Sequence, residues 1–377
     1  MRRTTLLAAL VAVMALVVAN PAPAAAVTQL MKLYQEPGDY EARFPDILKL
    51  DDGRLMAVWH RAKSHAGDPG TVQLSYGTGT SWTTPVPALA HPSLMSGKDV
   101  RDPKLGKMTD GAIVMTFFVP GDGVYSSVWK PGWTRFDDPE KLTVPGIPGS
   151  ALAQHGGVLA IPNLGDQVLV PVYNNTGAWF VRATWRPVTA PRLLVGDAFQ
   201  LAANTAAADG FTHTYTEPSF VQIDGTVVAV VRHELNKGSV SNGAPAKVLK
   251  WDPSTFTGTA SYYDVQEIPV WASSHHLLVT SQKKVLFTFG DKAVALRPTQ
   301  GILIDTPLAP WPTSGLTKVP IYNSGSGDQA NPSSVEVSAG RFFTLAYNAK
   351  PKSTVEGGGA SPNGGSLWVM ESLVGEY

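Results

Sequence analysis

Side chains that can perform chemistry are spread along the whole 377-residue chain. The histidines include two close groups: His60 and His65 stand on either side of Arg61, and His275 is followed by His276. A histidine in a pocket can act as an acid or a base, or bind a metal together with a carboxylate. The chain has no cysteine, which excludes a thiolate metal site and a cysteine nucleophile. No metal-ligand spacing is recognisable, so we expect neither a metal nor another cofactor.

A carboxylate and a guanidinium, those of Glu217 and Arg232, stand at the ends of two neighbouring apolar segments that a turn connects. We therefore expect both side chains on the same side of one hairpin. There they can form a structural ion pair across the sheet or part of a binding site. Asp68 lies in the Gly- and Pro-rich stretch His-Ala-Gly-Asp-Pro-Gly, which is also typical of a turn.

The elements that would position these residues recur along the chain. An apolar strand, a tight turn and a second apolar strand occur six times, with turns near residues 53, 111, 166, 225, 282 and 340. Successive turns are about 55 to 59 residues apart, a length suited to a four-stranded blade with one long loop. Beyond the N-terminal segment, no stretch has a sustained helical period. We predict an all-β fold, a six-bladed β-propeller formed by residues 27–377.

Closure of such a ring usually joins the two ends of the chain in one sheet. The apolar segments at residues 30–34 and 366–370 are suited to this pairing. We therefore expect them to be neighbouring strands, and deletion of the last dozen or so residues to unfold the domain.

The N-terminus has the features of a secretory signal peptide. A positive start, Met-Arg-Arg, precedes an apolar run and an Ala-Ala-Ala exit, which predicts cleavage after Ala26 and secretion. No other segment is apolar and long enough to span a bilayer, which needs about 20 residues. Lys plus Arg and Asp plus Glu balance at 30 each, so we expect no nucleic-acid partner. We expect a monomer that makes no membrane contact after signal cleavage.

Three motifs resemble those of the sialidase (neuraminidase) superfamily of six-bladed propellers, and the resemblance covers nearly the whole mature chain. Residues 42–45, Ala-Arg-Phe-Pro, resemble the Arg-Ile-Pro motif of the first blade. Residues 99–103, Asp-Val-Arg-Asp-Pro, resemble the segment that opens the second blade. Residues 75–82 resemble an Asp-box, Ser-x-Asp-x-Gly-x-Thr-Trp, with Gly77 and Ser81 in place of the aspartate and the threonine.

The resemblance implies a cluster of cations for a sugar carboxylate, because guanidinium forks match a carboxylate in bidentate fashion. In that family three arginines hold this group. Arg43 matches the first by motif, and Arg232 matches the second in a glutamate-strand-turn-strand-arginine unit. Lys292 stands at the position of the third, in Phe-Gly-Asp-Lys, and Arg297 is its nearest arginine substitute. Arg61 resembles a further family arginine.

The resemblance also implies roles for three carboxylates. Asp68 lies in the loop where the family has its acid/base aspartate. Glu217 matches the glutamate that activates a tyrosine nucleophile, and Asp102 matches an acidic pocket residue at the start of the second blade.

The nucleophile is where the chain departs from the family pattern. Alignment on the last turn places Asn331 near the position of the family's tyrosine, and an asparagine is no comparable nucleophile. We place Asn331 among the ligand-binding residues. Tyr322 is a candidate nucleophile if its loop folds back, and Tyr215 is another candidate on a different blade.

These features predict a secreted exo-glycosidase that hydrolyses a bond to an acidic, sialic-acid-like sugar. With a tyrosine in the site the enzyme would retain configuration. Without one, Asp68, Asp102 and Glu217 would support inversion by water. The alternatives are a non-catalytic glycan-binding propeller and a polysaccharide lyase with a histidine or tyrosine base. Aromatic side chains in expected loops either stack on sugar rings or pack between blades: Tyr125, Trp129 and Trp133.

Overall fold

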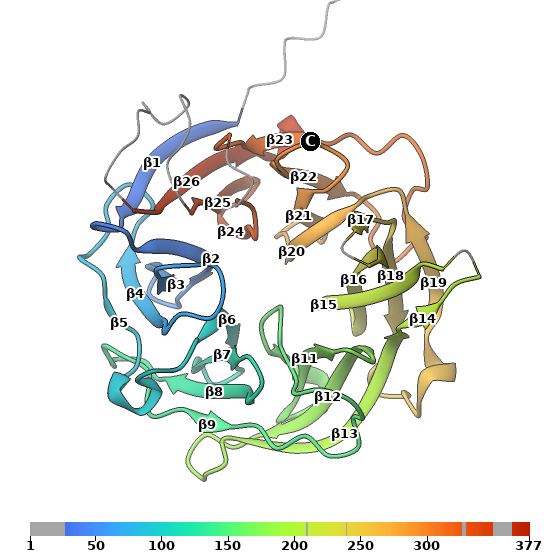
Figure 1. The fold of residues 1–377 in the computed structure, drawn as a ribbon, viewed down its shortest axis with the longest axis horizontal. Helices are drawn as coiled ribbons and strands as arrows, with labels where there is room; N and C mark the ends of the chain where they lie inside the picture. The colour runs from blue at the N-terminus through green and yellow to red at the C-terminus, as the bar shows by residue number, and fades with distance from the viewer. Residues whose placement is uncertain (1–26, 209, 239, 326–328, 350–363) are drawn as a thin grey trace, which may run out of the picture.

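The computed structural model describes residues 27–377 except for 209, 239, 326–328 and 350–363. Six antiparallel β-sheets stand around a central axis like the blades of a propeller (Figure 1). The predicted fold, an all-β six-bladed propeller, is confirmed. The expected signal peptide, residues 1–26, lies outside the described residues. Within the described ranges, no helix has the length and hydrophobicity needed to cross a membrane.

The blades follow one another in chain order, and in blades 1 to 5 the first strand stands at one edge of its sheet. Blade 1 contains β2 (Glu41–Lys49), β3 (Leu55–Ala62), β4 (Thr71–Gly77) and β5 (Val86–Pro87). Blade 2 contains β6 (Arg101–Lys107), β7 (Ile113–Val119), β8 (Gly123–Trp129) and β9 (Glu140–Lys141). Blade 3 contains β10 (Leu159–Ala160), β11 (Gln167–Asn174), β12 (Gly177–Trp185) and β13 (Leu193–Ala203).

Blade 4 is larger than the others. It contains β14 (Thr205–Ala206), β15 (Thr212–Ile223), β16 (Thr226–Lys237), β17 (Val240–Gly243), β18 (Ala246–Trp251) and β19 (Tyr263–Ile268). Blade 5 contains β20 (Ala272–Val279), β21 (Val285–Asp291), β22 (Thr299–Ile304) and β23 (Val319–Tyr322). Short 3-10 helices are η1 (Pro92–Met95), η2 (Pro162–Leu164), η3 (Thr259–Ser261) and η5 (Val374–Glu376).

Blade 6 joins the two ends of the described chain. It contains β24 (Ser333–Ser338), β25 (Arg341–Asn348) and β26 (Ser366–Leu373), and its outermost strand is β1 (Thr28–Gln35). The register pairs Lys32 with Trp368 and Tyr34 with Leu367. The expected pairing of residues 30–34 with 366–370 is therefore confirmed.

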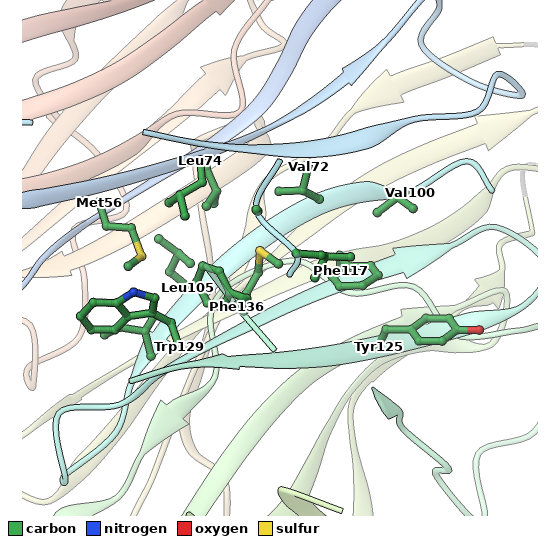
Figure 2. Packing of buried hydrophobic residues seen from close by; sticks show 14 of the residues in the cluster. Met56, Val72, Leu74, Val100, Leu105, Phe117, Tyr125, Trp129 and Phe136 are labelled. Atoms are coloured by element: carbon green, nitrogen blue, oxygen red, sulfur yellow. The ribbon is translucent and has the colours of Figure 1, made fainter. Parts of the chain in front are cut away.

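The core lies between the blades, because alternate side chains of each strand face the two neighbouring blades. In β7, Met115 and Phe117 pack against blade 1, whereas Val114 packs with blade 3. Figure 2 shows Phe117 and Trp129 of blade 2 on the same interface as Met56 and Leu74 of blade 1. This two-sided burial explains why the strands are continuous apolar runs.

A left-handed residue recurs at the beginning of the first strand in every blade. The backbone angle φ is positive at Phe44, Asp102, Gly156, Glu217, Ser274 and Asn331. Four of these residues precede a proline, and Gly156 precedes a second glycine. In blades 1, 2, 4 and 5 the register of the strand pair shifts at this point. Such bulges re-aim a side chain. Non-glycine residues at positive φ store strain, which typically gathers at functional sites.

The degenerate Asp-box forms a tight turn between β4 and β5. The Thr78 N–H donates to the Ser81 carbonyl oxygen over 3.0 Å, and Gly77 pairs with Trp82. A Cβ at residue 77 would lie only 2.4 Å from the Trp82 ring. Packing of Trp82 therefore requires the glycine that replaces the aspartate.

Candidate functional site

The polar side chains that meet near the axis lie at one end of the ring, where the first strands begin and the second strands end. We call Asp102, Tyr173, Glu217, Arg232 and Asn331 the axial site. They come from blades 2, 3, 4 and 6, so only closure of the ring brings them together.

Asn331 connects blade 6 to blade 2. Its Nδ2 donates to Asp102 Oδ1 over 2.9 Å, and its Oδ1 accepts from Lys104 Nζ over 2.8 Å. Both ends of the amide are therefore held, and Asn331 positions Asp102 and Lys104 relative to each other. Lys104 is buried. The sequence does not single it out as a site residue, because nothing there distinguishes it from other lysines near the start of a strand.

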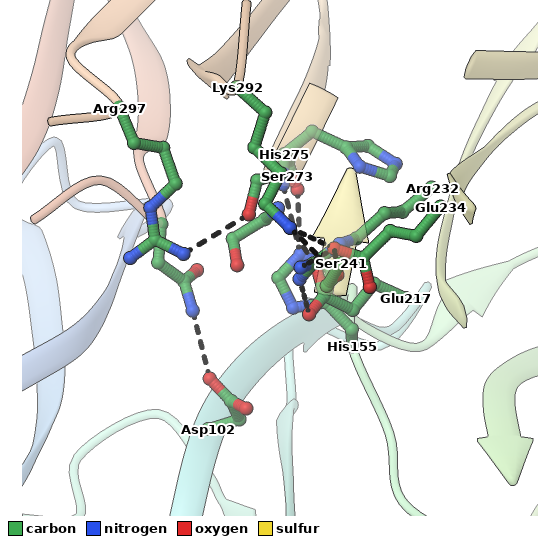
Figure 3. A network of polar contacts seen from close by, with 12 residues as sticks. Asp102, His155, Glu217, Arg232, Glu234, Ser241, Ser273, His275, Lys292 and Arg297 are labelled. Atoms are coloured by element: carbon green, nitrogen blue, oxygen red, sulfur yellow. Dashed lines mark hydrogen bonds and ion pairs between the residues drawn. The ribbon is translucent and has the colours of Figure 1, made fainter. Parts of the chain in front are cut away.

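Asp102 has an acidity suited to proton transfer. Burial raises the pKa of its carboxyl to about 6, and the Glu217 charge also raises it, whereas Lys104 and Asn331 oppose the shift. Figure 3 shows Asp102 on the other side of the cluster from Glu217 and Arg232. A carboxyl with this pKa can hold a proton close to neutral pH and then release it.

Glu217 has the opposite character. Its Oε1 accepts from Arg232 Nη1 over 2.5 Å, and its Oε2 accepts from the Ser274 N–H over 2.8 Å. Burial raises its pKa, but the Arg232 charge opposes burial, and the pKa is lowered to about 2. Glu217 is thus a permanent anion.

Arg232 is shared between two carboxylates (Figure 3). Its Nη2 donates to Glu234 Oε1 over 2.6 Å, in addition to the Glu217 contact. The β16–β17 hairpin supplies Ser241, which donates to the same Glu234 oxygen over 3.1 Å. Lys292 of blade 5 also binds Glu234. Two of the predicted cations, Arg232 and Lys292, therefore meet on Glu234.

Tyr173, at the end of β11, is a member of the axial site that the sequence interpretation missed. Burial raises the pKa of its phenol well above the usual value, and the charges of Glu217 and Asp102 raise it further, whereas Arg232 lowers it. The hydroxyl therefore stays protonated. The sequence does contain a signal for it. Tyr173 stands at the end of the second strand of the third repeat, which is the position that Arg232 occupies in the fourth repeat.

Histidines lie beside the axial site and are uncharged. His155 Nε2 is 2.9 Å from the His275 carbonyl oxygen, and His275 Nε2 is 3.0 Å from the Val230 carbonyl oxygen. Burial lowers the pKa of His155 to about 3 and that of His275 to about 4. His276 instead accepts from the Ser334 N–H of blade 6, so the two adjacent histidines face opposite ways. No group of three or more metal-ligating side chains is present among the described residues.

The blade 1 arginines have internal partners. Arg43 is 3% exposed and binds Glu41 and His65. Arg61 donates to Glu36 over 2.7 Å and lies 3.6 Å from the centre of the Tyr40 ring. Both arginines therefore hold the start of blade 1 together.

Asp68 stands half-buried in the loop after β3. The preceding residue, Gly67, donates its N–H to Asp99 over 2.8 Å, and His65 contacts Arg43. These contacts hold the loop against the starts of blades 1 and 2. Asp68 is not part of the hydrogen-bonded cluster, and its acid/base role stays a prediction.

Arg297 differs from the other predicted cations. Its Nη1 donates to Ser273 Oγ over 3.2 Å and its Nη2 to the Gln329 carbonyl oxygen over 2.9 Å. Both partners are neutral, and no carboxylate of a described residue is bonded to this guanidinium. Arg297 is therefore available to an anionic ligand.

The two candidate tyrosine nucleophiles are elsewhere. Tyr322 lies on β23, the outermost strand of blade 5, where it packs against Trp368 and Met370 of blade 6. The structure therefore does not bring Tyr322 to the axis. Tyr215 stacks on His233 with ring centres 4.4 Å apart, inside blade 4.

Comparisons with known proteins agree on the fold. No protein-family model matches the chain, and no curated protein matches its sequence. A Dyadobacter fermentans protein of unknown function shares 16% identity over 93% of this chain and all of its own, with a TM-score of 0.68. A Trypanosoma rangeli sialidase shares 12% identity over 94% of this chain, which spans 60% of that protein, with a TM-score of 0.60. An alpha-L-arabinanase from Penicillium chrysogenum shares 13% identity over 93% of this chain and 99% of its own, with a TM-score of 0.61. The protein therefore has the six-bladed propeller fold of these glycosidases.

Proposed function

We propose that the protein is a glycoside hydrolase that acts at the axial site on a sugar carrying an acidic group. The observation that carries this proposal is the pair of carboxyl groups with separated acidities. The pKa of Asp102 is raised to about 6, and that of Glu217 is lowered to about 2. Two carboxyl groups that divide the protonated and ionised roles are typical of glycosidases.

Each side chain then has one role. Asp102 donates its proton to the glycosidic oxygen as the bond to the anomeric carbon breaks. The anionic Glu217 stabilises the positive charge that develops on the sugar ring. Water adds to the anomeric carbon, and because Glu217 is too weak a base, the proton of that water passes to Asp68 in the loop after β3. Tyr173 stays protonated and donates a hydrogen bond to the sugar.

The preference for an acidic sugar rests on Arg297. Arg43, Arg232 and Lys292 already have protein carboxylates as partners, whereas Arg297 bonds only to neutral oxygens. A ligand carboxylate on Arg297 would form charge-assisted hydrogen bonds without displacing an internal anion.

The other mechanisms receive less support. A family-type tyrosine nucleophile would stand where Asn331 binds Asp102 and Lys104. A lyase needs a base, but the raised pKa of Tyr173 opposes loss of its proton and His155 and His275 are deeply buried. A binding-only propeller would bind glycans at the same groups without forming product.

The test is hydrolysis of aryl sialosides, uronides and arabinosides by the wild type and four variants. Asp102→Asn and Glu217→Gln should each lower kcat by about 10²-fold or more. Arg297→Met should raise KM for the acidic substrates and leave KM for neutral ones unchanged. The control, Asp166→Asn, alters an exposed turn residue of blade 3 and should have no effect.

Three outcomes would contradict the proposal. Turnover that survives both Asp102→Asn and Glu217→Gln would remove the axial site from the chemistry. Glycan binding with no turnover of any substrate would favour the binding-only alternative. An unsaturated product that absorbs in the ultraviolet would identify a lyase.

We also propose that the protein acts outside the cell, because residues 1–26 read as a signal peptide. N-terminal sequencing of protein recovered from the culture medium should begin at Val27. Retention of the intact N-terminus inside the cell would contradict this.

A further inference from the structure

A second concave region lies at the outer edge of the ring, away from the axial site. We call it the rim groove. Its volume is about 950 Å³, within the range of ligand pockets. It is lined by residues 90–91 after blade 1, by residues 132–140 between β8 and β9, and by Arg192 between β12 and β13. Three consecutive blades therefore contribute to it.

Trp133 forms an exposed aromatic surface in this groove. Its side chain is 41% exposed, although its backbone is fixed. The Trp133 N–H donates to the Lys130 carbonyl oxygen over 2.9 Å, and its own carbonyl accepts from the Trp129 indole over 2.7 Å. Lys130 lies 5.6 Å from the centre of the Trp133 ring, and its Nζ is itself held by the Pro187 carbonyl oxygen at 2.7 Å. The Trp133 backbone is therefore held in place before any ligand arrives, and Lys130 lies against one part of its ring.

The floor beneath Trp133 is rigid. Phe136 is fully buried in the core between blades 1 and 2, and its backbone exchanges hydrogen bonds with residues 88 and 90 over 2.8 Å each. A ligand entering the groove would meet little loss of conformational entropy in the protein, which favours affinity.

The polar side chains in the groove are of mixed charge. Asp138 pairs with His91 at 2.6 Å, and Glu140 accepts the Arg192 N–H over 2.7 Å. The lining includes three carboxylates, of Asp137, Asp138 and Glu140, and two guanidinium groups, of Arg135 and Arg192. This mixture of charges gives no preference for an anion, and it supplies hydrogen-bond donors and acceptors in the same groove as the Trp133 ring.

We propose that the rim groove binds a neutral oligosaccharide, with a sugar ring on Trp133 and its hydroxyl groups on the surrounding carboxylates and Arg135. An aromatic face matches the C–H face of a sugar, and planar charged groups pair with hydroxyls in two directions. The groove lies outside the outermost strand of a four-stranded blade, which places it about 15 Å or more from the innermost strand. It is therefore a site separate from the axial one.

A polysaccharide long enough to reach both sites would bind more tightly than a short one, since the second contact becomes intramolecular. This consequence rests on the proposed function, but binding at the groove does not. The experiment therefore reads binding and hydrolysis separately.

The test is affinity electrophoresis of the purified protein in gels containing soluble arabinan, arabinoxylan, galactan, mixed-linkage glucan or polysialic acid. We expect at least one neutral polysaccharide to retard the wild type and Trp133→Ala to weaken that retardation about five- to tenfold in apparent affinity. The control is Tyr263→Ala, which removes an aromatic side chain of similar exposure, 45%, from β19 of blade 4, outside the rim groove. It should behave as the wild type, and both variants should keep the wild-type rate on small aryl glycosides.

The proposal would be overturned by equal retardation of the wild type and Trp133→Ala in every neutral gel. It would also be overturned by retardation in polysialic acid alone, which would make the ligand a polyanion. Light scattering tests whether a second copy of the chain occupies the groove instead. A wild-type dimer that Trp133→Ala converts to a monomer would show that the groove is a contact between two copies and would overturn the proposal. If the wild type and both variants fail to hydrolyse aryl glycosides but retardation still depends on Trp133, the proposed function is refuted. The proposal for the rim groove is then unaffected.

Discussion

Blades 1 and 4 both direct an arginine of the expected anion-binding set toward the same end of the ring, but they use it differently. In blade 1, Arg43 is almost fully buried and binds Glu41, two residues earlier in the same strand, together with His65 of the loop after β3. In blade 4, Arg232 joins Glu217 to Glu234, and Lys292 of blade 5 shares the latter. The blade 1 contacts are internal to one blade, whereas those of blade 4 cross to its neighbour and to the axis.

The difference shows that a residue that matches a family motif does not necessarily belong to the site. An arginine beside a strand start can hold its own blade together or contribute to a shared centre, according to which carboxylates reach it. Blade 4 reaches further because β15 and β16 are each twelve residues long and β16 continues into the β16–β17 hairpin. That added hairpin supplies Ser241 and orients Glu234.

Acid should produce the largest effect, and it should act on blade 1 itself and on the histidines of blades 3 and 5, of which His275 contacts blade 4. Burial lowers the pKa of His60 in blade 1 to about 3, and those of His155, His275 and His276 to about 3, 4 and 3. Unfolded histidines titrate near pH 6.5, so the unfolded state takes up more protons as the pH falls below this value. The free energy of unfolding should then drop by about 1.4 kcal/mol per histidine and pH unit. Urea unfolding at pH 7.5, 6 and 5 measures it, and equal stability at pH 6 and pH 5 would contradict it.

Removal of each arginine tests the comparison directly. Arg232→Met and Arg43→Met should each lower the free energy of unfolding by about 3–5 kcal/mol, because a buried carboxylate loses its partner. Arg54→Met, which breaks an exposed pair with Asp52, should cost less than about 1 kcal/mol. Urea titration measures these values.

Turnover separates the two blades once stability is known. At a temperature where both variants are folded, Arg232→Met should abolish hydrolysis and Arg43→Met should retain it. Loss of turnover in folded Arg43→Met would place the blade 1 arginine in the site, and the contrast between the blades would fail.

Asp102→Asn should stabilise the protein while it removes activity. The pKa of Asp102 is raised to about 6 in the folded state, so the ionised carboxylate is disfavoured above that pH and the protonated form is not. At pH 8 the substitution should therefore increase the free energy of unfolding by about 2–3 kcal/mol. Below pH 4 the gain should vanish, because the carboxyl is then protonated in both states. A variant that is less stable at pH 8 would show that Asp102 is a structural anion like Glu41.

The smallest effect concerns the bulge of blade 5. Its left-handed residue, Ser274, has the same backbone strain as Glu217 in blade 4 but carries no charge. Ser274 and Glu217 have similar positive φ values, 48° and 52°. Ser274→Gly relieves that backbone and should raise the free energy of unfolding by about 0.5–1 kcal/mol. Thermal unfolding measures it, and a lower Tm would mean that the serine side chain makes up for the strain. The backbone N–H that donates to Glu217 is kept, so turnover should not change.

The architecture was predictable because its signals are local. Turn glycines recur at a fixed interval, and apolar runs on both sides of each turn require burial on two faces. The pairing of β1 with β26 followed from the same logic. The positions of Asp102 and Glu217 were also accessible, since each precedes a proline at the start of a first strand.

The remainder of the site depends on distances that no local pattern contains. Glu41 and Glu234 neutralise predicted cations only because of how strands pair and blades meet. Tyr173 belongs to the axial site because blade 3 faces blades 2 and 4, and Tyr322 is excluded because its strand is the outermost of blade 5. The resemblance to a known family indicated which residue types to look for. Closure of the propeller ring determines which of those side chains contact one another.

Strand β1 also imposes an order on folding. It is the first described strand to be synthesised, yet its only partner in the sheet is β26, which is the last. Until that final segment emerges, blade 6 lacks its middle and the ring has two open ends with unpaired strand edges. Such edges invite association between chains, and contacts so distant in sequence form slowly. The nascent chain therefore passes its most aggregation-prone interval with five blades present and the sixth incomplete.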